Sequence, residues 1–201
     1  YFESVRMIRI VADVSTTSST SIDFIEHPSS DARIAASIHQ LLVEVDNEFV
    51  PPLSCRNNAT IKNFAAVSDS NDPGEYIHQT LSRPSLVVFR DGEFAGLMSF
   101  RLHYRDSYLN IGNPCTYVVT VATHRQYRRQ GVARELYEAL FGLAPEFASP
   151  FVATRTWNAN ASHIALLKKL GFQQMNRLHN DRGFGIDTLY FARSLHTVGR
   201  L

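Results

Sequence analysis

Cysteine is scarce in this chain, which has only two among its 201 residues, Cys55 and Cys115. Two isolated cysteines exclude a disulfide-dense scaffold and the paired spacing of a structural zinc site. No apolar stretch reaches the roughly 18 residues that span a bilayer, so we expect no membrane partner. Acidic and basic residues nearly balance, at 19 against 20, which argues against a basic surface for nucleic acid.

What is present suits a soluble cytoplasmic protein. An apolar content of 44% can supply the packed core of one domain, which we expect to span residues 1–201. Both thiols are expected to stay reduced, and we expect no metal site. The first residue is Tyr1 instead of Met, so a processed or truncated N-terminus stays open.

Two common phosphate-binding patterns are also absent, because the chain contains neither a Walker loop nor a Gly-x-Gly-x-x-Gly string. It has instead a basic run, residues 124–133, between a strand-like segment and a helix-like segment. This run contains Arg128, Gly131 and the small Ala133. A helix N-terminus carries unpaired N–H groups and about half a positive charge, so it favours an anion. The run therefore predicts a cradle for a diphosphate.

The pattern Arg128-x-x-Gly131-x-Ala133 resembles the Arg/Gln-x-x-Gly-x-Gly/Ala signature of the GNAT superfamily of N-acetyltransferases. For this hexapeptide alone, an exposed basic turn is the alternative. A later segment, residues 160–172, is similar to the family's Asn-x-x-Ala-Ile-x-Leu-Tyr-x-Lys-Leu-Gly-Phe segment. A strand-like stretch lies between the two, as in the family. The resemblance covers residues 86–195.

The resemblance implies an α+β fold with a GNAT-like mixed, mostly antiparallel sheet, helices on both faces and a central splay between two parallel strands. Residues 1–84 would form the acceptor side and residues 85–195 the acetyl-CoA-binding core. The pantetheine arm would pair with backbone groups in the splay, and the loop amides would take the diphosphate. The residues implied to bind acetyl-CoA are Val121, Thr123, Arg128, Arg129, Gln130, Gly131, Val132, Ala133 and Asn160.

Hydrophobic periodicity and turn residues predict the individual elements. Strands are expected at residues 5–14, 22–26, 85–90, 93–101, 115–123, 151–157, 172–178 and 186–195, and helices at residues 31–49, 75–81, 131–143 and 162–170. Asp91-Gly92 favours a two-residue hairpin turn. Asn160 and Ser162 both suit the N-cap of the last helix, and we assign the cap to Ser162. Gly171 predicts the end of that helix.

The resemblance also implies the reaction, transfer of an acetyl group from acetyl-CoA to a primary amine. Many family members protonate the CoA sulfur with a tyrosine, and Leu167 occupies that position here. Leucine cannot donate a proton, so a missing acid and simple helix packing both stay open. The catalytic residues are therefore unknown. Side chains that could move a proton, and that also suit plain packing, are His103, Tyr104, Cys115, Tyr117 and His163.

The acceptor is expected to be a small-molecule or peptide amine. Glu44, Asp46 and Glu48, with the loop around Asp181, could attract a cationic amine or form an ordinary solvated face. A non-catalytic acyl-CoA-binding sensor or interaction module is the alternative function. An ATP-binding loop is disfavoured by the missing Walker lysine. A homodimer is compatible with the sequence.

Overall fold

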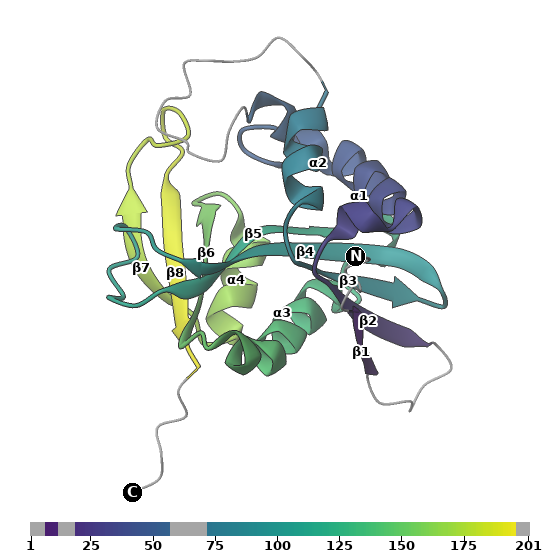
Figure 1. Ribbon diagram of the computed structural model, residues 1–201. Helices are drawn as coiled ribbons and strands as arrows, with labels where there is room; N and C mark the ends of the chain where they lie inside the picture. The colour runs from purple at the N-terminus through teal and green to yellow at the C-terminus, as the bar shows by residue number, and fades with distance from the viewer. Residues whose placement is uncertain (1–6, 12–18, 57–71, 196–201) are drawn as a thin grey trace, which may run out of the picture. The chain divides into compact units, whose positions relative to one another are not determined.

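The structure, a computed structural model, describes residues 7–11, 19–56 and 72–195. Strands and helices follow one another in an α+β order within these ranges (Figure 1). The strands are β1 (Met7–Val11), β2 (Thr20–Ile25), β3 (Ser85–Arg90), β4 (Glu93–Tyr104), β5 (Cys115–Thr123), β6 (Phe151–Trp157), β7 (Gln173–Leu178) and β8 (Thr188–Ser194). The α-helices are α1 (Ala32–Val45), α2 (Gly74–Leu81), α3 (Val132–Leu143) and α4 (Ala161–Lys169).

The chain divides into two compact units. The first unit holds residues 1–99 and 120–139, and its strands follow the hydrogen-bonded order β1-β2-β3-β4-β5. The second unit holds residues 100–119 and 140–201, with the order β4-β5-β6-β8-β7. Strands β4 and β5 and helix α3 therefore contribute residues to both units. The functional division between residues 84 and 85 stays a prediction.

Helix α1 covers one face of the sheet in the first unit. Asp31 caps the helix, because its carboxylate accepts from the N–H groups of Arg33 and Ile34 at 2.8 and 3.1 Å. Apolar residues recur every three or four positions along α1, so one face of the helix is buried. Figure 1 shows α1 and α2 together on one side of β3 and β4. The buried cluster that joins them is Ile25, Ile34, Ile38, Leu41, Leu42, Val45, Leu53, Tyr76, Ile77, Val87, Leu97 and Ala122.

The opposite face of β4 approaches helix α3 at Gly96. Leu97 belongs to the cluster under α1, so the preceding residue points to the other face of the sheet. A Cβ atom at Gly96 would lie 2.8 Å from Cγ1 of Val132 and 2.9 Å from the carbonyl oxygen of Ala122. Helices therefore cover both faces of the sheet in this unit.

We expect Gly96→Ala to lower the free energy of unfolding by roughly 1–3 kcal/mol, as overpacking does in other cores. The carbonyl of Ala122 is backbone and cannot turn aside as a side chain would. Urea unfolding followed by circular dichroism measures the change. Gly142→Ala is the control, because no atom lies within 4 Å of a Cβ there. An unchanged midpoint for Gly96→Ala would contradict the close approach.

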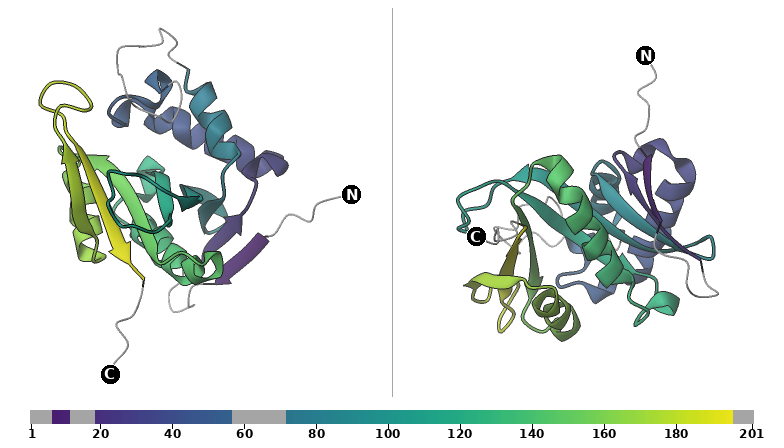
Figure 2. Two further views of the ribbon diagram at one scale, coloured as in Figure 1. Left: turned by 60° about the vertical axis from the view of Figure 1, so that its left-hand side comes forward. Right: turned by 90° about the horizontal axis from the view of Figure 1, so that it is seen from below.

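The second unit contains the pair of parallel strands. Strands β5 and β6 pair in parallel from Thr116 and Val152 to Val118 and Thr154, while β6 with β8 and β7 with β8 are antiparallel. Figure 2 shows β7 and β8, drawn in yellow-green and yellow, side by side. Both parallel strands continue past the last pair, and the hydroxyl of Thr154 there donates to the carbonyl of Val118 at 3.1 Å. The parallel pairing of β5 and β6 therefore ends at Val118 and Thr154, before either strand does.

The predicted fold class is confirmed, and β3, β5 and β6 have the expected bounds. The first helix ends at Val45, however, four residues before the expected Phe49. Asp46 begins a short 3-10 turn, and its carboxylate accepts from the N–H of Ser54 at 2.7 Å and from its hydroxyl at 2.9 Å. This contact with a later segment explains the early end. Residues 5–6 and 12–14 of the expected first strand lie outside the described residues.

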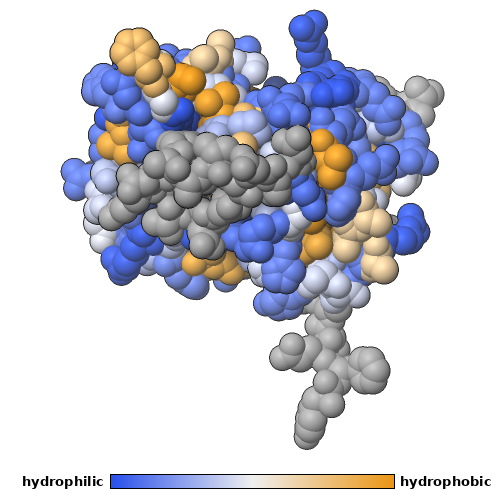
Figure 3. Space-filling view, turned by 90° about the horizontal axis from the view of Figure 1, so that it is seen from above, coloured by the Kyte–Doolittle hydropathy of each residue, from blue (hydrophilic) through white to orange (hydrophobic). Residues whose placement is uncertain are grey.

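Large apolar side chains on the surface are few among the described residues. The exposed ones are Val43, Tyr108, Met175 and Phe184. On the face drawn in Figure 3, hydrophilic side chains predominate and the apolar ones form small separate groups. None of the helices in the described part of the chain has the length and apolar character to cross a membrane.

Candidate functional site

The loop between β5 and α3 bends sharply before the helix begins. Residues Arg125–Tyr127 form a 3-10 turn, and α3 starts at Val132. Between them, φ is +62° at Arg129 and +87° at Gly131. Glycine adopts this left-handed region without the steric cost that other residues have. Bends of this kind can direct successive backbone N–H groups toward a common side, where an anion binds.

The backbone N–H groups of residues 129–133 form what we call the N–H cluster. Within the described chain, none of these five residues donates its N–H to another group. The first helical bond at this end runs from the N–H of Glu135 to the carbonyl of Gly131, at 3.0 Å. Residues 129–131 are exposed, so a ligand can approach. Unpaired donors at a helix start favour an anion by their partial charge and by their direction.

The guanidinium of Arg128 is held by the chain itself. Its Nε donates to the carbonyl of Thr123 at 3.3 Å, and its NH2 group lies 2.6 Å from the carboxylate of Glu48. The two side chains of the ion pair are 39% and 35% exposed, so water and salt weaken their attraction. The carbonyl of Thr123, which we expected to pair with the pantetheine arm, therefore already has a donor.

Glu44 in the last turn of α1 and Glu48 in the 3-10 turn that follows it anchor the loop. Glu44 accepts from Nδ1 of His124 at 2.6 Å and from the N–H of Arg125 at 2.9 Å. Burial acts to raise the pKa of Glu44, but these donors outweigh it, and the pKa lies below its ordinary value. Glu48 accepts from Nε of Arg125 at 3.0 Å. Since 80 residues separate Glu44 from His124, sequence patterns gave no signal for this contact.

A further anchor holds the first turn of α3. The NH2 group of Arg90 donates to both carboxylate oxygens of Glu135, at 2.7 and 2.8 Å, and to the carbonyl of Gln130 at 3.3 Å. The side chain of Arg90 is 11% exposed, so solvent screens this ion pair less than that of Arg128. The loop is thus held on both sides of the N–H cluster. Glu44 binds residues 124 and 125 before the cluster, and Arg90 binds Glu135 after it.

The remaining predicted cofactor residues lie on two other elements. Val121 and Thr123 are in the last three residues of β5, beyond the last residue that pairs with β6, and both are partly exposed. Asn160 precedes α4 in the second unit. Their contact with acetyl-CoA stays a prediction.

Asn160 is the N-cap of α4, so the predicted cap at Ser162 is wrong. The Oδ1 atom of Asn160 accepts from the N–H of His163 and from the hydroxyl of Ser162, both at 3.3 Å. Its Nδ2 group donates to the hydroxyl of Thr156 at 3.1 Å, which orients the carboxamide. Ser162 lies inside the first turn, where its N–H rather than its hydroxyl needs a partner.

Leu167 is part of the buried core, with 0% of its surface exposed. Its carbonyl accepts from the N–H of Phe172 at 3.0 Å, and the N–H of Gly171 bonds to the carbonyl of Lys168 at 3.1 Å. With φ at +79°, Gly171 completes a Schellman motif. The predicted helix end is confirmed, and packing accounts for a leucine at position 167.

Comparison with known proteins decides the family. A model of the Acetyltransferase (GNAT) family matches residues 55–172, more than half of the chain, including the loop with the N–H cluster. The chain belongs to the GNAT acetyltransferase family. The predicted family is therefore confirmed. A search of curated protein sequences gives no match.

Solved structures share the fold of this GNAT acetyltransferase. An aminoglycoside 6′-N-acetyltransferase in complex with coenzyme A has a TM-score of 0.61 at 11% identity, over 88% of this chain and 99% of that one. The ribosomal-protein-S18-alanine N-acetyltransferase from Escherichia coli has a TM-score of 0.58 at 15% identity, over 90% of this chain and 97% of that one. The protein yncA from Salmonella typhimurium, solved with its cofactor acetyl-CoA, has 0.53 at 19% identity, over 96% of each chain. At these identities the likeness shows the fold.

Several candidate proton-transfer groups of this acetyltransferase have shifted pKa values. Burial, with the nearby charge of Asp106, raises the pKa of the Cys115 thiol to about 12, so Cys115 is not a thiolate at neutral pH. Burial also raises the pKa values of Tyr104 and Tyr117. His163 has its pKa lowered by burial to about 4, so its ring is neutral at pH 7 and is a weaker base than a solvated histidine.

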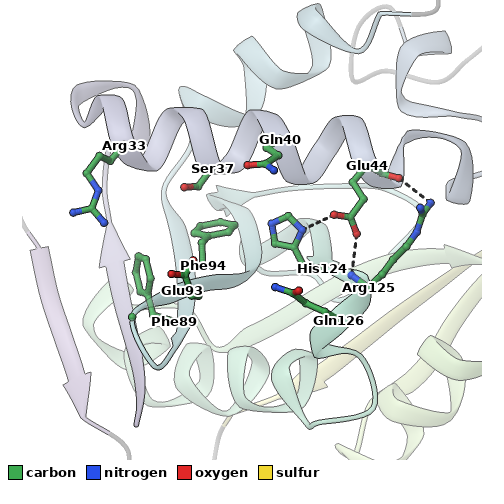
Figure 4. Close-up of a pocket in the computed structure, with 11 residues that line it drawn as sticks. Arg33, Ser37, Gln40, Glu44, Phe89, Glu93, Phe94, His124, Arg125 and Gln126 are labelled. Atoms are coloured by element: carbon green, nitrogen blue, oxygen red, sulfur yellow. Dashed lines mark hydrogen bonds and ion pairs between the residues drawn. The ribbon is translucent and has the colours of Figure 1, made fainter. Parts of the chain in front are cut away.

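A cavity of about 570 Å³ lies in the first unit between α1 and the β3–β4 hairpin. Figure 4 shows Ser37, Gln40 and Glu44 pointing from α1 toward Phe94 and His124. The rings of Phe94 and His124 meet edge to face with centroids 6.0 Å apart. The lining residues are Arg33, Ser37, Gln40, Glu44, Phe89, Gly92, Glu93, Phe94, His124, Arg125 and Gln126. None of the predicted acetyl-CoA-binding residues is among them.

The acidic residues considered for an amine acceptor are engaged within the chain. Glu44 and Glu48 hold the loop, as described above. Asp46 accepts from Ser54, and the carboxylate of Asp181 accepts from the hydroxyl of Thr188 at 2.5 Å. No group of three or more His, Cys, Asp or Glu side chains in the described ranges is arranged to hold a metal ion. These carboxylates are therefore structural contacts.

Proposed function

We propose that this GNAT acetyltransferase moves an acetyl group from acetyl-CoA to a primary amine and binds the diphosphate of acetyl-CoA on its N–H cluster. The observation that supports this proposal is the set of five successive backbone N–H groups at the start of α3, residues 129–133, which have no partner within the described chain and lie inside the range that the family model matches. Fixed donors cost no reorganisation when the anion binds, and the anchors at Glu44, Glu48 and Arg90 supply that fixation.

The other predicted contacts follow from the same geometry. An extended pantetheine arm can pair with the free edge of β5 at Val121 and Thr123, as an added strand does. Pairing at the carbonyl of Thr123 would displace Nε of Arg128, which then becomes free to meet a phosphate oxygen. Asn160 can reach the arm only with a donor or acceptor that its capping bonds leave unused.

The chemistry requires a neutral amine, a polarised thioester carbonyl and a proton for the leaving thiolate. Holding the amine and the thioester in line can lower the barrier by roughly 7–11 kcal/mol without any acid or base. A buried Leu167 at the usual tyrosine position is therefore compatible with turnover. The acceptor class that we propose is a small-molecule or peptide amine.

Arg128→Ala should weaken acetyl-CoA binding only about two- to fivefold at low salt, and less at high salt, because Arg128 is partly exposed and already paired with Glu48. Calorimetry at two salt concentrations measures the change. Arg134→Ala is the control, since Arg134 is 67% exposed and pairs with Glu138 on the surface of α3. A loss in Arg128→Ala that does not respond to salt would contradict this account.

The test of the proposed function combines binding and turnover. Calorimetry with acetyl-CoA should show one saturable site from which ATP does not displace it. Release of free CoA is then followed with amino acids, polyamines, aminoglycosides and peptides as acceptors. Turnover with one class supports the proposal, and absence of acetyl-CoA binding overturns it. Binding without turnover across the whole panel would overturn the transfer step in favour of an acyl-CoA-binding sensor or interaction module.

A further inference from the structure

A half-buried arginine in the second unit is surrounded by tyrosines. The NH1 group of Arg155 on β6 lies 3.4 Å from the hydroxyl of Tyr190, its cross-strand partner on β8. Tyr117 on β5 pairs with Ala153, two residues before Arg155, so it shares the same face of the sheet. The ring centroid of Tyr104 is 4.5 Å from that of Tyr117. We call Tyr104, Tyr117, Arg155 and Tyr190 the Arg155 cluster.

Arg155 lacks an acidic partner. Within the described residues its guanidinium forms no ion pair, and the hydroxyl of Tyr190 is its one hydrogen-bond partner. A guanidinium carries several N–H donors in a rigid fork, so most of them are unused here. The largely buried Arg90 does pair with a carboxylate, that of Glu135. Because a desolvated charge is costly without a counter-charge, the cluster is short of one anion.

The tyrosines of the cluster supply neutral hydrogen-bond donors. Burial raises the pKa values of Tyr104, Tyr117 and Tyr190, so all three keep their phenol protons at neutral pH. The hydroxyls of Tyr104 and Tyr117 form no hydrogen bond with the described part of the chain. A guanidinium flanked by phenol donors is well suited to a carboxylate, which accepts at two oxygens.

The position of the cluster connects it with the reaction. Arg155 directly follows Thr154, the last residue of β6 that pairs with β5, so it lies just past the end of the parallel pairing. An amine acceptor that also carries a carboxylate can therefore meet the unused donors of Arg155 with that group.

We propose that the Arg155 cluster binds the carboxylate of the amine acceptor, so that the acceptor is an amino acid or another amine with a carboxylate rather than a polyamine or an aminoglycoside. This inference rests on the proposed acetyl transfer for the role of acceptor. The carboxylate-binding site itself does not depend on acetyl-CoA.

The binding test uses the chain's one tryptophan. Trp157 lies two residues after Arg155 on β6, so its side chain is on the same face of the strand. The probes are the standard L-amino acids, each paired with its own primary carboxamide, titrated without acetyl-CoA and followed by Trp157 fluorescence, with calorimetry as a check. We expect at least one acid to bind about tenfold or more tightly than its amide, as a charge-assisted contact provides.

Two variants distinguish binding at the Arg155 cluster from a general effect of losing one positive charge. In Arg155→Gln the ratio of acid affinity to amide affinity should fall to about one. In Arg105→Gln, which removes the same charge from an exposed position, that ratio should stay at its wild-type value. Matching far-ultraviolet spectra show that both variants fold. Equal binding of acids and amides by the wild type overturns the proposal, and so does a ratio that survives in Arg155→Gln or falls equally in Arg105→Gln.

Acetyl-CoA binding, measured separately, keeps this proposal distinct from the proposed function. Selective acid binding without any acetyl-CoA binding would leave the carboxylate site standing and overturn acetyl transfer. Turnover of amines with no preference for the acids would leave acetyl transfer standing and overturn the inference.

Discussion

Gly131→Asp should weaken acetyl-CoA binding by about 100-fold or more, the largest loss expected from a single change in the loop. Gly131 has φ at +87°, and a Cβ there would lie 3.4 Å from a carboxylate oxygen of Glu135. An aspartate side chain therefore adds a second negative charge beside the N–H cluster and covers the donors that the diphosphate needs. The new carboxylate repels the ligand and can accept the same N–H groups in its place.

Calorimetry with acetyl-CoA measures this loss, and circular dichroism establishes that the variant is folded. The matched control is Gly112→Asp, which introduces the same residue at a similar φ of +69° where no atom lies within 4 Å of a Cβ. The control accounts for the strain of a non-glycine residue in the left-handed region. Unchanged affinity in a folded Gly131→Asp variant would remove the central claim about the N–H cluster.

Leu167→Tyr should lower the free energy of unfolding by roughly 1–3 kcal/mol and should not increase turnover. The sequence left two explanations for Leu167 open, a missing catalytic acid or simple packing. Complete burial of the side chain favours packing. A tyrosine would have to place a larger ring and a hydroxyl group in a space that leucine fills.

Chemical unfolding measures the loss of stability, and the rate of CoA release measures turnover. Ala165→Tyr is the control, because residue 165 is on the exposed side of the same helix and should tolerate the ring. A Leu167→Tyr variant that is as stable as the wild type and faster in turnover would show that a missing acid, and not packing, explains the leucine.

Some features of this protein were decided by short stretches of sequence. The hairpin between β3 and β4 turns at Asp91 and Gly92, whose φ values are +50° and +82°. Gly171 ends α4 with φ at +79°. Such positions are predictable because a tight turn or a helix end requires a positive φ, which few residue types adopt without steric cost. The family signature around Gly131 belongs to the same class.

Local signals gave the wrong boundary where a more distant group supplied the hydrogen bonds. Hydrophobic periodicity predicts that the first helix continues past Asp46 to residue 49. Asp46 instead lies after the end of α1, where its carboxylate accepts hydrogen bonds from Ser54. Ser162 suits an N-cap by residue type, yet Asn160 caps α4 while Thr156 orients its side chain. In each case a contact between elements outweighed a local preference worth about 1 kcal/mol.

The sequence by itself determined the family, the mixed α+β fold and the loop that carries the N–H cluster, because periodicity, turn residues and a short signature are local properties. Only the tertiary structure decided that Glu44 and Arg90 hold this loop, and that Arg155 lies among tyrosines of three other strands. These contacts join residues far apart in the chain. A charged side chain has no preferred partner in sequence, since its Coulomb attraction depends on the distances that folding creates.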